Sequence, residues 1–333
     1  MHIGSHYDLK TFILWTRRTI YWLVLWAFTS TALFKLAGFT WLAIPWVPIA
    51  LIGTATSFIA GFKNTQTYNR LWEARQIWGG IVNSSRTLGI MVNSYIRTGD
   101  ETQKRYHQEI IYRHIAWLTA LRFQLRESKN WENIKTKSYN VEFRELYSID
   151  EWEKQLPDEL KPFLSENELN YVLSTKNRAT QIIALQSEQL RTLTDQGHLN
   201  TLYHVELENV LKEFYEHQGK SERIKNFPYP RQFASINLFF VRLLVILIPF
   251  GLLNEFAKLG EYGVWLNIPF SVVVSWVFTS LEQVGESTEN PFEGGPNDVP
   301  ITSMSRTIEI DLREMLGEIE LPLPVKASNE ILM

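Results

Sequence analysis

Two long apolar blocks, separated by an extended polar stretch, most constrain what this chain can fold into. The first block holds the apolar runs Thr19–Phe34 and Trp41–Phe62, and the second holds Phe233–Leu253 and Tyr262–Leu281. The run Trp41–Phe62 has 22 residues, which as a helix of about 33 Å would cross a hydrocarbon core of roughly 30 Å. Short turns join the two runs of each block. The sequence therefore predicts an all-α integral membrane protein with four transmembrane helices in two hairpins.

Basic residues flank these runs mainly on the side of the chain termini and the polar stretch. They are Lys10, Arg17, Arg18, Lys63, Arg70, Arg75, Lys225 and Arg231, whereas each hairpin turn carries one lysine. Cytoplasmic loops of membrane proteins are enriched in Lys and Arg. We therefore expect a multi-pass protein of the inner (plasma) membrane, with both termini and the polar stretch in the cytoplasm.

This pattern divides the chain into four regions. Residues 1–64 would hold an N-terminal cytosolic helix and the first hairpin, and residues 65–230 a large helical cytosolic domain. Residues 231–285 would hold the second hairpin, and residues 286–333 a cytosolic C-terminal helix and tail.

Apolar residues at helical spacing predict the helices of the cytosolic part. These helices are expected over Glu101–Arg126, Pro157–Thr194, Leu199–His217 and Thr302–Leu316, with a loop over Ser128–Pro157.

Composition and missing motifs exclude several classes of function. The chain has no cysteine, which excludes disulfides and thiolate metal sites, and its net charge of −3 gives no reason to expect a nucleic-acid partner. The serine-hydrolase, HExxH, phosphate-loop and GxGxxG motifs are missing. The seven histidines are scattered. The sequence therefore predicts no enzyme activity, no cofactor and no metal site.

Two stripes of residues spaced four apart lie side by side on the run Trp41–Phe62. One stripe is Thr54, Phe58 and Phe62, and the other, one residue earlier, is Gly53, Ser57 and Gly61. Small residues let neighbouring helices approach closely, while large residues beside them could point to a common axis. This pattern fits a ring of identical helices, and it also fits aromatic residues that face lipid or a protein core.

Arg242 lies inside an apolar run, where an ionisable residue is rare unless it is paired or near an interface. Glu282, at the end of the fourth run, is the expected partner. Alternatively, Arg242 marks the cytoplasmic edge of the third span.

Two segments far apart in the chain resemble the bestrophins, specifically their bacterial branch. They are GFKNTQTYNRLWEARQIWG at Gly61–Gly79 and ENPFEGGPNDVPITSMSRTIEIDLREM at Glu289–Met315. Both segments occur in the family's order, and the hydropathy layout agrees, so the resemblance spans nearly the whole chain. It implies a homopentameric ion channel with one central pore. The expected partners are further copies of the chain, the lipid bilayer and permeant inorganic ions.

The resemblance also implies positions for the pore constrictions. A hydrophobic neck would fall on Thr54, Phe58 and Phe62, the stripe that the spacing already marks, with pore-helix packing at the adjacent small residues. A cytosolic aperture would fall on Leu202, after the Gly197–Leu199 turn.

One part of the family's pattern differs in this chain. Animal members bind Ca²⁺ through an acidic run after NPF, where this chain has only Glu293 and Asp298. We therefore expect no Ca²⁺ gating of that type.

An apolar neck has no fixed charge, so its width and wetting would control passage. Phenylalanine edges carry partial positive charge and faces partial negative charge, so edge-on rings at Phe58 and Phe62 would favour anions and face-on rings cations. The Thr54 hydroxyl can serve either sign. The resemblance links aromatic necks to anion channels, and a more aliphatic neck to a cation-permeable relative. We expect passive anion (chloride) conductance, with a monovalent cation (sodium) channel of the same fold as the alternative.

Two other classes of protein remain open. Prolines inside or beside the apolar runs could mark the broken helices of a secondary transporter. A membrane-anchored structural or signalling protein would use the two stripes for packing alone.

Overall fold

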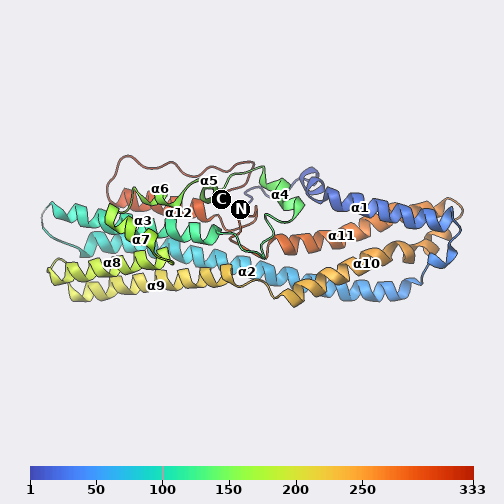
Figure 1. Cartoon of the computed structure of the whole chain (residues 1–333), viewed down its shortest axis with the longest axis horizontal. Helices are drawn as coiled ribbons and strands as arrows, with labels where there is room; N and C mark the ends of the chain where they lie inside the picture. The colour runs from blue at the N-terminus through green and yellow to red at the C-terminus, as the bar shows by residue number, and fades with distance from the viewer. Residues whose placement is uncertain (100) are drawn as a thin grey trace.

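The chain forms an elongated bundle of helices with two distinct ends (Figure 1). One end consists of α1 (Leu9–Lys35), the first part of α2 (Trp46–Tyr95), α10 (Arg231–Ala257) and α11 (Asn267–Ser287). The computed structural model describes residues 1–99 and 101–333, and within them the only extended pairing is two isolated β-bridges. The predicted all-α architecture is confirmed for this part of the chain.

Three helical segments among the described residues are long and apolar enough to cross a membrane. They are Thr40–Tyr95, Arg231–Ala257 and Gly263–Ser287. The α1 helix is not among them, because Arg17 and Arg18 lie within it and leave an uncharged apolar run, Thr19–Phe34, that is too short. It nevertheless packs along α11 and α10 at the same end of the molecule (Figure 1). A fourth span through α1 therefore stays a prediction.

The α2 helix is a single element of 50 residues, about 75 Å long at the usual rise per residue. Pro45 precedes it and Pro48 lies in its first turn, where backbone N–H groups have no partner within the helix. The helix continues without interruption past residue 64, the predicted limit of the first region. The same rod therefore belongs to both ends of the molecule.

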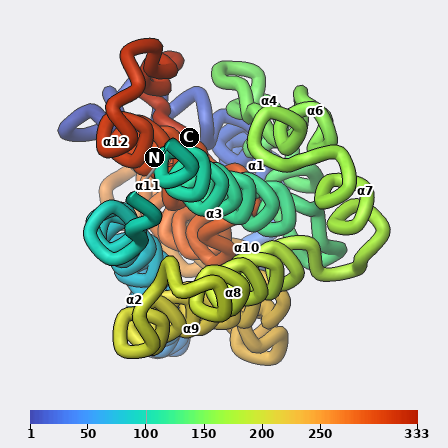
Figure 2. Tube along the Cα trace, turned by 90° about the vertical axis from the view of Figure 1, so that its left-hand side faces the viewer, coloured from blue at the N-terminus to red at the C-terminus, as the bar shows by residue number. Residues whose placement is uncertain are grey.

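The second half of α2 is packed into a bundle of longer helices, seen end-on in Figure 2. These are α3 (Thr102–Arg126), α8 (Arg178–Asp195), α9 (Thr201–Asn226) and α12 (Ile301–Met315). Their apolar faces form the main core, in which Trp78, Trp117 and Phe214 are among the largest fully buried side chains. The helices predicted over Glu101–Arg126 and Thr302–Leu316 are confirmed.

Short helices form the part of the chain between α3 and α8. They are α4 (Ser138–Arg144), α5 (Asp150–Glu153), α6 (Leu156–Leu160) and α7 (Glu166–Ser174). The prediction of one helix over Pro157–Thr194 is wrong. Ser165 and Glu168 form a capping box that starts α7, and Asn177 caps the start of α8. The loop predicted over Ser128–Pro157 contains α4 and α5.

The prolines of the second apolar block have less effect than the sequence suggests. Prolines in these runs could have marked broken helices, but neither proline interrupts its helix. Pro249 lies inside α10, which continues to Ala257. Pro269 is the third residue of α11, where its missing N–H removes no helical hydrogen bond. A 3₁₀ turn at Gly263–Leu266 precedes α11.

The segment between α11 and α12 is buried, although connecting segments normally run over the surface. Its backbone groups have internal partners. The Asp298 carboxylate accepts hydrogen bonds from the backbone N–H groups of Gly294 (2.7 Å) and Gly295 (3.0 Å). The Tyr147 hydroxyl donates to the Gly294 carbonyl at 2.8 Å. The segment is therefore a fixed part of the core between the two ends.

Gly294→Ala is expected to destabilise the protein more than Gly260→Ala. Both glycines have positive φ, 92° and 99°, and an alanine in such a region costs about 1–3 kcal/mol. At Gly294 the added methyl would also lie 2.6 Å from Ile149 and 2.9 Å from Trp152, whereas nothing lies within 4 Å of it at Gly260. Crowding should add about 1–3 kcal/mol at Gly294. Thermal unfolding in detergent measures the difference, and equal losses in the two variants would contradict the crowding.

Candidate pore-lining site

One face of α2 is left uncovered by the rest of the chain. It carries Thr54, Phe58 and Phe62, the residues predicted for the neck, and all three are exposed. The side chains of Phe58 and Phe62 are 76% and 52% exposed. The Phe62 ring lies 6.2 Å from that of Phe233 in the first turn of α10. The stripe inferred from spacing is therefore an exposed apolar surface in the isolated subunit.

This exposed face extends along α2 beyond the three residues predicted for the neck. Tyr68 and Trp72 are more than half exposed, and their rings stack with centroids 6.5 Å apart. Residues 54 and 72 differ by five turns of an α-helix, so they point in the same direction. The spacing was readable from the sequence, but the polar residues between Phe62 and Trp72 concealed it.

The hydroxyl groups of this face donate to their own helix. Thr54 Oγ1 donates to the Ala50 carbonyl (3.0 Å), and Ser57 Oγ donates to the Gly53 carbonyl (2.9 Å). In this arrangement each oxygen offers only its lone pairs outward. The Thr54 hydroxyl would have to rotate before it could donate a hydrogen bond to a passing anion.

The small residues beside the stripe have different surroundings. Gly53 faces α10 of its own subunit, where an added methyl would lie 3.6 Å from Leu244. Ser57 is exposed, and nothing lies within 4 Å of a methyl built on Gly61. Ser57 and Gly61 are thus available to another helix, while Gly53 already serves packing inside the subunit. The role of this stripe between subunits stays a prediction.

The residue after Phe62 anchors the helix. Lys63 Nζ lies 2.6 Å from Glu282 Oε1 of α11, and these side chains are only 3% and 7% exposed. Asn237 of α10 donates a further hydrogen bond to Glu282. Asn64 donates to the Leu281 carbonyl at 3.2 Å. The Phe62 end of the predicted neck is therefore fixed to both α10 and α11.

The expected pairing of Arg242 with Glu282 is wrong. Glu282 is engaged by Lys63 and Asn237, while Arg242 is exposed and has no hydrogen bond or ion pair to the described residues. Lys63 and Glu282 approach because α2 and α11 pack side by side. Spacing along the chain gives no direct signal for such a contact.

Arg70 lies two turns after Lys63 in α2 and joins three segments of the chain. Its Nη2 donates to the carbonyls of Ile224 (3.1 Å) and Phe227 (2.9 Å) at the C-terminal end of α9, and its Nε donates to the Glu289 carbonyl (3.0 Å). These carbonyls lie where a helix ends or a loop begins, so they lack helical partners. Arg70 thus fixes α2 to the segments that precede α10 and follow α11.

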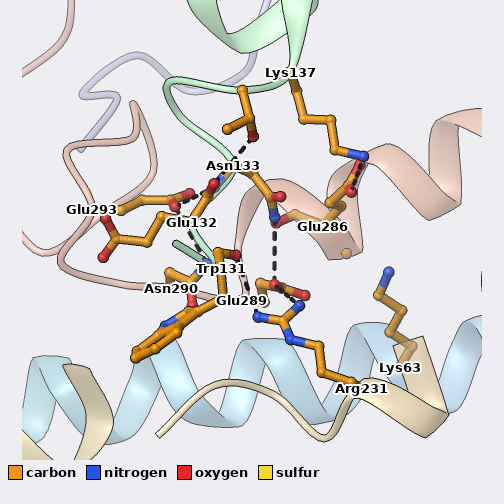
Figure 3. A network of polar contacts seen from close by, with 12 residues as sticks. Lys63, Trp131, Glu132, Asn133, Lys137, Arg231, Glu286, Glu289, Asn290 and Glu293 are labelled. Atoms are coloured by element: carbon orange, nitrogen blue, oxygen red, sulfur yellow. Dashed lines mark hydrogen bonds and ion pairs between the residues drawn. The ribbon is translucent and has the colours of Figure 1, made fainter. Parts of the chain in front are cut away.

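Figure 3 shows the polar network that continues from this point. Arg231, the first residue of α10, lies 3.1 Å from Glu289, and Lys137 lies 2.6 Å from Glu286. Asn133 contacts Glu289, and its backbone N–H donates to Glu293 at 2.9 Å. Burial raises the pKa of the Glu289 carboxyl, and Arg231 opposes that rise. This network joins the two ends of the molecule.

The two acidic residues of the NPF segment are already engaged. Asp298 is buried against Arg126, with its carboxylate 3.3 Å from the guanidinium Nη1. Burial raises the pKa of Asp298 to about 6, although Arg126 lowers it. Glu293 accepts hydrogen bonds from Asn133 and Asn290. Across residues 1–99 and 101–333, no group of three or more His, Cys, Asp or Glu could hold a metal ion. The absence of Ca²⁺ gating remains a prediction.

Leu202, predicted for the cytosolic aperture, is 76% exposed at the second position of α9. Gly197 has φ of 77°, which turns the chain between α8 and α9. The side chain of Asn200 accepts a hydrogen bond from the Leu202 N–H at 2.9 Å. The neighbouring Tyr203 stacks on Tyr95 at the end of α2, with centroids 4.2 Å apart. Leu202 therefore lies next to the C-terminal end of α2. By helical rise, that end is about 50 Å from Phe62.

Comparison with known proteins identifies relatives over nearly the full length. The family described as Bacterial/Fungal Bestrophin protein matches residues 15–314. The voltage-dependent anion channel-forming protein YneE of Escherichia coli O157:H7 is 26% identical over 325 residues, which cover 93% of this chain and 94% of that protein. The protein of that description from Ralstonia nicotianae, RSc3414, is 25% identical and covers 81% of this chain and 77% of its own length.

Solved structures share the fold. The crystal structure of a bacterial bestrophin homologue from Klebsiella pneumoniae matches with a TM-score of 0.75 at 24% identity, covering 90% of this chain and 98% of that chain. Another crystal structure, described as a membrane protein, matches with a TM-score of 0.76 at 23% identity and covers 92% of this chain.

Lys63→Met is expected to destabilise the protein by about 3–5 kcal/mol, because it leaves the Glu282 carboxylate buried without its cation. Adding Glu282→Gln to this variant should restore part of the loss. The exposed pair Lys258–Glu255, 2.8 Å apart, provides the control, and Lys258→Met should cost less than about 1 kcal/mol. Thermal unfolding in detergent tests the comparison. Similar losses in the two single variants would show that the buried pair does not fix α2.

Proposed function

The chain belongs to the bacterial and fungal bestrophin family, and on this basis we propose that it is an ion channel of the inner membrane. It assembles as a homopentamer around one central pore, and α1, α2, α10 and α11 of each subunit span the bilayer. The exposed face of α2 lines that pore. Thr54, Phe58 and Phe62 form its neck, and Leu202 forms a second constriction at the cytosolic end.

The extent of the exposed α2 face is the observation that carries this proposal. Phe58 and Phe62 could face lipid if they stood alone. Trp72, however, lies about 39 Å along the helix from Trp46, beyond a hydrocarbon core of roughly 30 Å. Exposed aromatic residues on this face therefore continue past the membrane, beyond the polar Thr65 and Asn69, and Tyr68 and Trp72 would face water in a single subunit. Such a patch marks an interaction surface, and further copies of α2 around an axis would enclose it.

The termini support the proposed orientation. The backbone N–H of Leu332 donates to the Met1 carbonyl at 2.9 Å, and His2 and Ile331 form a bridge, so the two ends of the chain lie together (Figure 1). They therefore lie on one side of any membrane that the helices cross. The excess of basic residues on that side favours the cytoplasm.

Anion conductance is the preferred form of the proposal. The relatives from Escherichia coli and Ralstonia nicotianae are named as anion channel-forming proteins. The neck would present aromatic ring edges, which attract anions weakly, and no acidic side chain lies among Thr54, Phe58 and Phe62. A secondary transporter with broken helices is less well supported, because α2 and α10 continue past their prolines.

An apolar neck also suggests how such a channel would gate. With no charge to compensate for lost hydration, an ion passes only when the neck is wide enough to stay wetted. The Lys63–Glu282 pair and the Arg70 contacts would hold α2 at the membrane boundary. Changes in neck width would then involve movement of α10 and α11 together with α2.

Phe58→Ala should raise single-channel conductance in planar bilayers, because it removes the most exposed ring of the neck. Phe28→Ala is the matched control, since Phe28 is a half-exposed phenylalanine of α1, away from the α2 face, and its loss should leave conductance unchanged. Mass determination in detergent should give five subunits for both variants and for the unmodified protein. An unchanged conductance in Phe58→Ala would remove Phe58 from the pore, and a monomer or dimer would contradict the ring.

In asymmetric NaCl, currents through the reconstituted channel should reverse near the chloride equilibrium potential. This outcome follows from edge-on aromatic rings in a neck without fixed charge. A reversal near the sodium equilibrium potential would sink the anion assignment and favour the cation channel. Flux that saturates and couples to a second gradient would favour a transporter.

A further inference from the structure

A large cavity lies in the cytosolic part of the subunit, away from the exposed face of α2. It has a volume of about 870 Å³ and is bordered by the C-terminal ends of α3 and α9, by the α7–α8 connection and by Trp152. Small-molecule sites usually occupy about 300–1,000 Å³. The cavity borders α9 just before the segment that leads into α10. It is therefore large enough for a small molecule and close to the membrane boundary.

Basic side chains dominate the charge of its wall. They are Arg126, Lys129, Lys135, Lys176, Arg178 and Lys225. With three carboxylates in the same wall, the formal charge of the wall is six minus three, or +3. Two further carboxylates outside the wall, Glu132 and Asp298, pair with Lys225 and Arg126, so an excess of one positive charge remains when they are counted. A cavity with this excess attracts anions.

Half of these basic groups have protein partners. Lys225 pairs with Glu132, and Arg126 pairs with Asp298. Lys135 donates to Ser128 Oγ at 2.6 Å and lies 4.5 Å above the Trp152 ring. These three groups shape the wall, but they do not need a ligand.

The other three basic side chains are Lys129, Lys176 and Arg178. Within the residues that the structure describes, none of them has a side-chain hydrogen bond or ion pair. The Nε atom of Arg178 is buried and has no hydrogen-bond acceptor. The Nη atoms of Arg178 are not buried in this way, and they too have no acceptor among the described residues. An anion in the cavity could therefore accept hydrogen bonds from these outer atoms of the guanidinium.

The carboxylates of the wall are mostly committed elsewhere. Glu222 accepts hydrogen bonds from the amides of Gln124, Asn177 and Gln218. Glu151 pairs with Arg122 and accepts from Thr302. Only Glu127, which is exposed, has no such partner among the described residues. The carboxylates therefore leave the free cations available.

Helix orientation adds to this field. Asn177 caps α8 and Arg178 is its first residue, so the N-terminus of this 18-residue helix borders the cavity. Such an end carries partial positive charge and free N–H groups. The C-terminal ends of α3 and α9 also border the cavity, but Arg126 and Lys225 in their last turns offset the negative ends.

We propose that this cavity binds a phosphate-bearing anion through Arg178, with Lys129 and Lys176 as further contacts. Arginine pairs with phosphate oxygens through two parallel hydrogen bonds, which suits an unpartnered guanidinium. Three free cations and this volume fit a group with several negative charges better than a single halide ion. The phosphate belongs to a soluble ester or to the headgroup of an anionic lipid, since the cavity lies near the membrane boundary.

Inorganic pyrophosphate is a suitable probe for the intact channel in neutral detergent at fixed ionic strength. Isothermal titration calorimetry should show saturable binding to the unmodified protein. Arg178→Gln should weaken it by roughly 10-fold or more, the range expected for a lost charged hydrogen bond. Arg178→Lys, which keeps the charge but not the fork, should lose less.

Arg191→Gln is the matched control. Arg191 is an exposed arginine of the same helix, about 20 Å from Arg178 by helical rise, and its loss removes the same charge. This variant should bind pyrophosphate like the unmodified protein, with an unchanged unfolding temperature in both Gln variants. Absence of saturable binding, or equal affinities in Arg178→Gln and Arg191→Gln, would overturn the proposal.

Nanodiscs distinguish the two sources of phosphate. If a lipid headgroup occupies the cavity, pyrophosphate should bind more weakly in phosphatidylglycerol nanodiscs than in phosphatidylcholine nanodiscs, and Arg178→Gln should remove that difference. Equal affinity in both lipids, together with loss in Arg178→Gln, assigns the cavity to a soluble ligand.

Discussion

The arrangement of α2, α10 and α11 depends on the buried pair of Lys63 and Glu282. Two charges removed from water are stable only when they meet closely and their remaining hydrogen-bonding capacity is used, and Asn237 supplies a further partner. This requirement brings α2, α10 and α11 together at one level. Because Lys63 follows Phe62 directly, the two side chains point about 100° apart around the helix axis. The contact of Lys63 with Glu282 therefore also sets the direction of Phe62.

After Lys63, α2 is held by ionic and charged hydrogen-bonding contacts that the predicted neck does not have. Arg70 binds the exposed carbonyls at the end of α9, and Arg231 and Glu289 extend the contacts to α10 and to the segment after α11. The neck itself contains no ionised side chain. Ionic contacts therefore hold the helices at the boundary, while apolar surface faces the proposed pore. The cavity near Arg178 differs again, since its cations are left without partners.

The features that could be predicted from the sequence are those encoded in local spacing. The periodicity of apolar residues gave α3 and α12 within a few residues, and four-residue spacing located the exposed stripe of α2. Contacts between distant segments could not be predicted in this way. The partner of Glu282 lies 219 positions away in the chain, so Arg242, nearer in sequence, was the wrong choice. The breaks before α7 and before α8 were missed because the apolar pattern continues through the caps at Ser165 and Asn177.

The uninterrupted course of α2 has a consequence for biosynthesis. Its membrane half can enter the bilayer early, but its second half exposes Trp78 and Leu88 until α9 and α12 are made, and α12 lies almost at the end of the chain. During translation this apolar surface must remain outside the membrane without its partners, a situation that promotes aggregation. A ribosome that stops before α12 would therefore leave a subunit that is inserted but incompletely packed. Chaperones or proteases would have to bind or degrade it at the membrane surface.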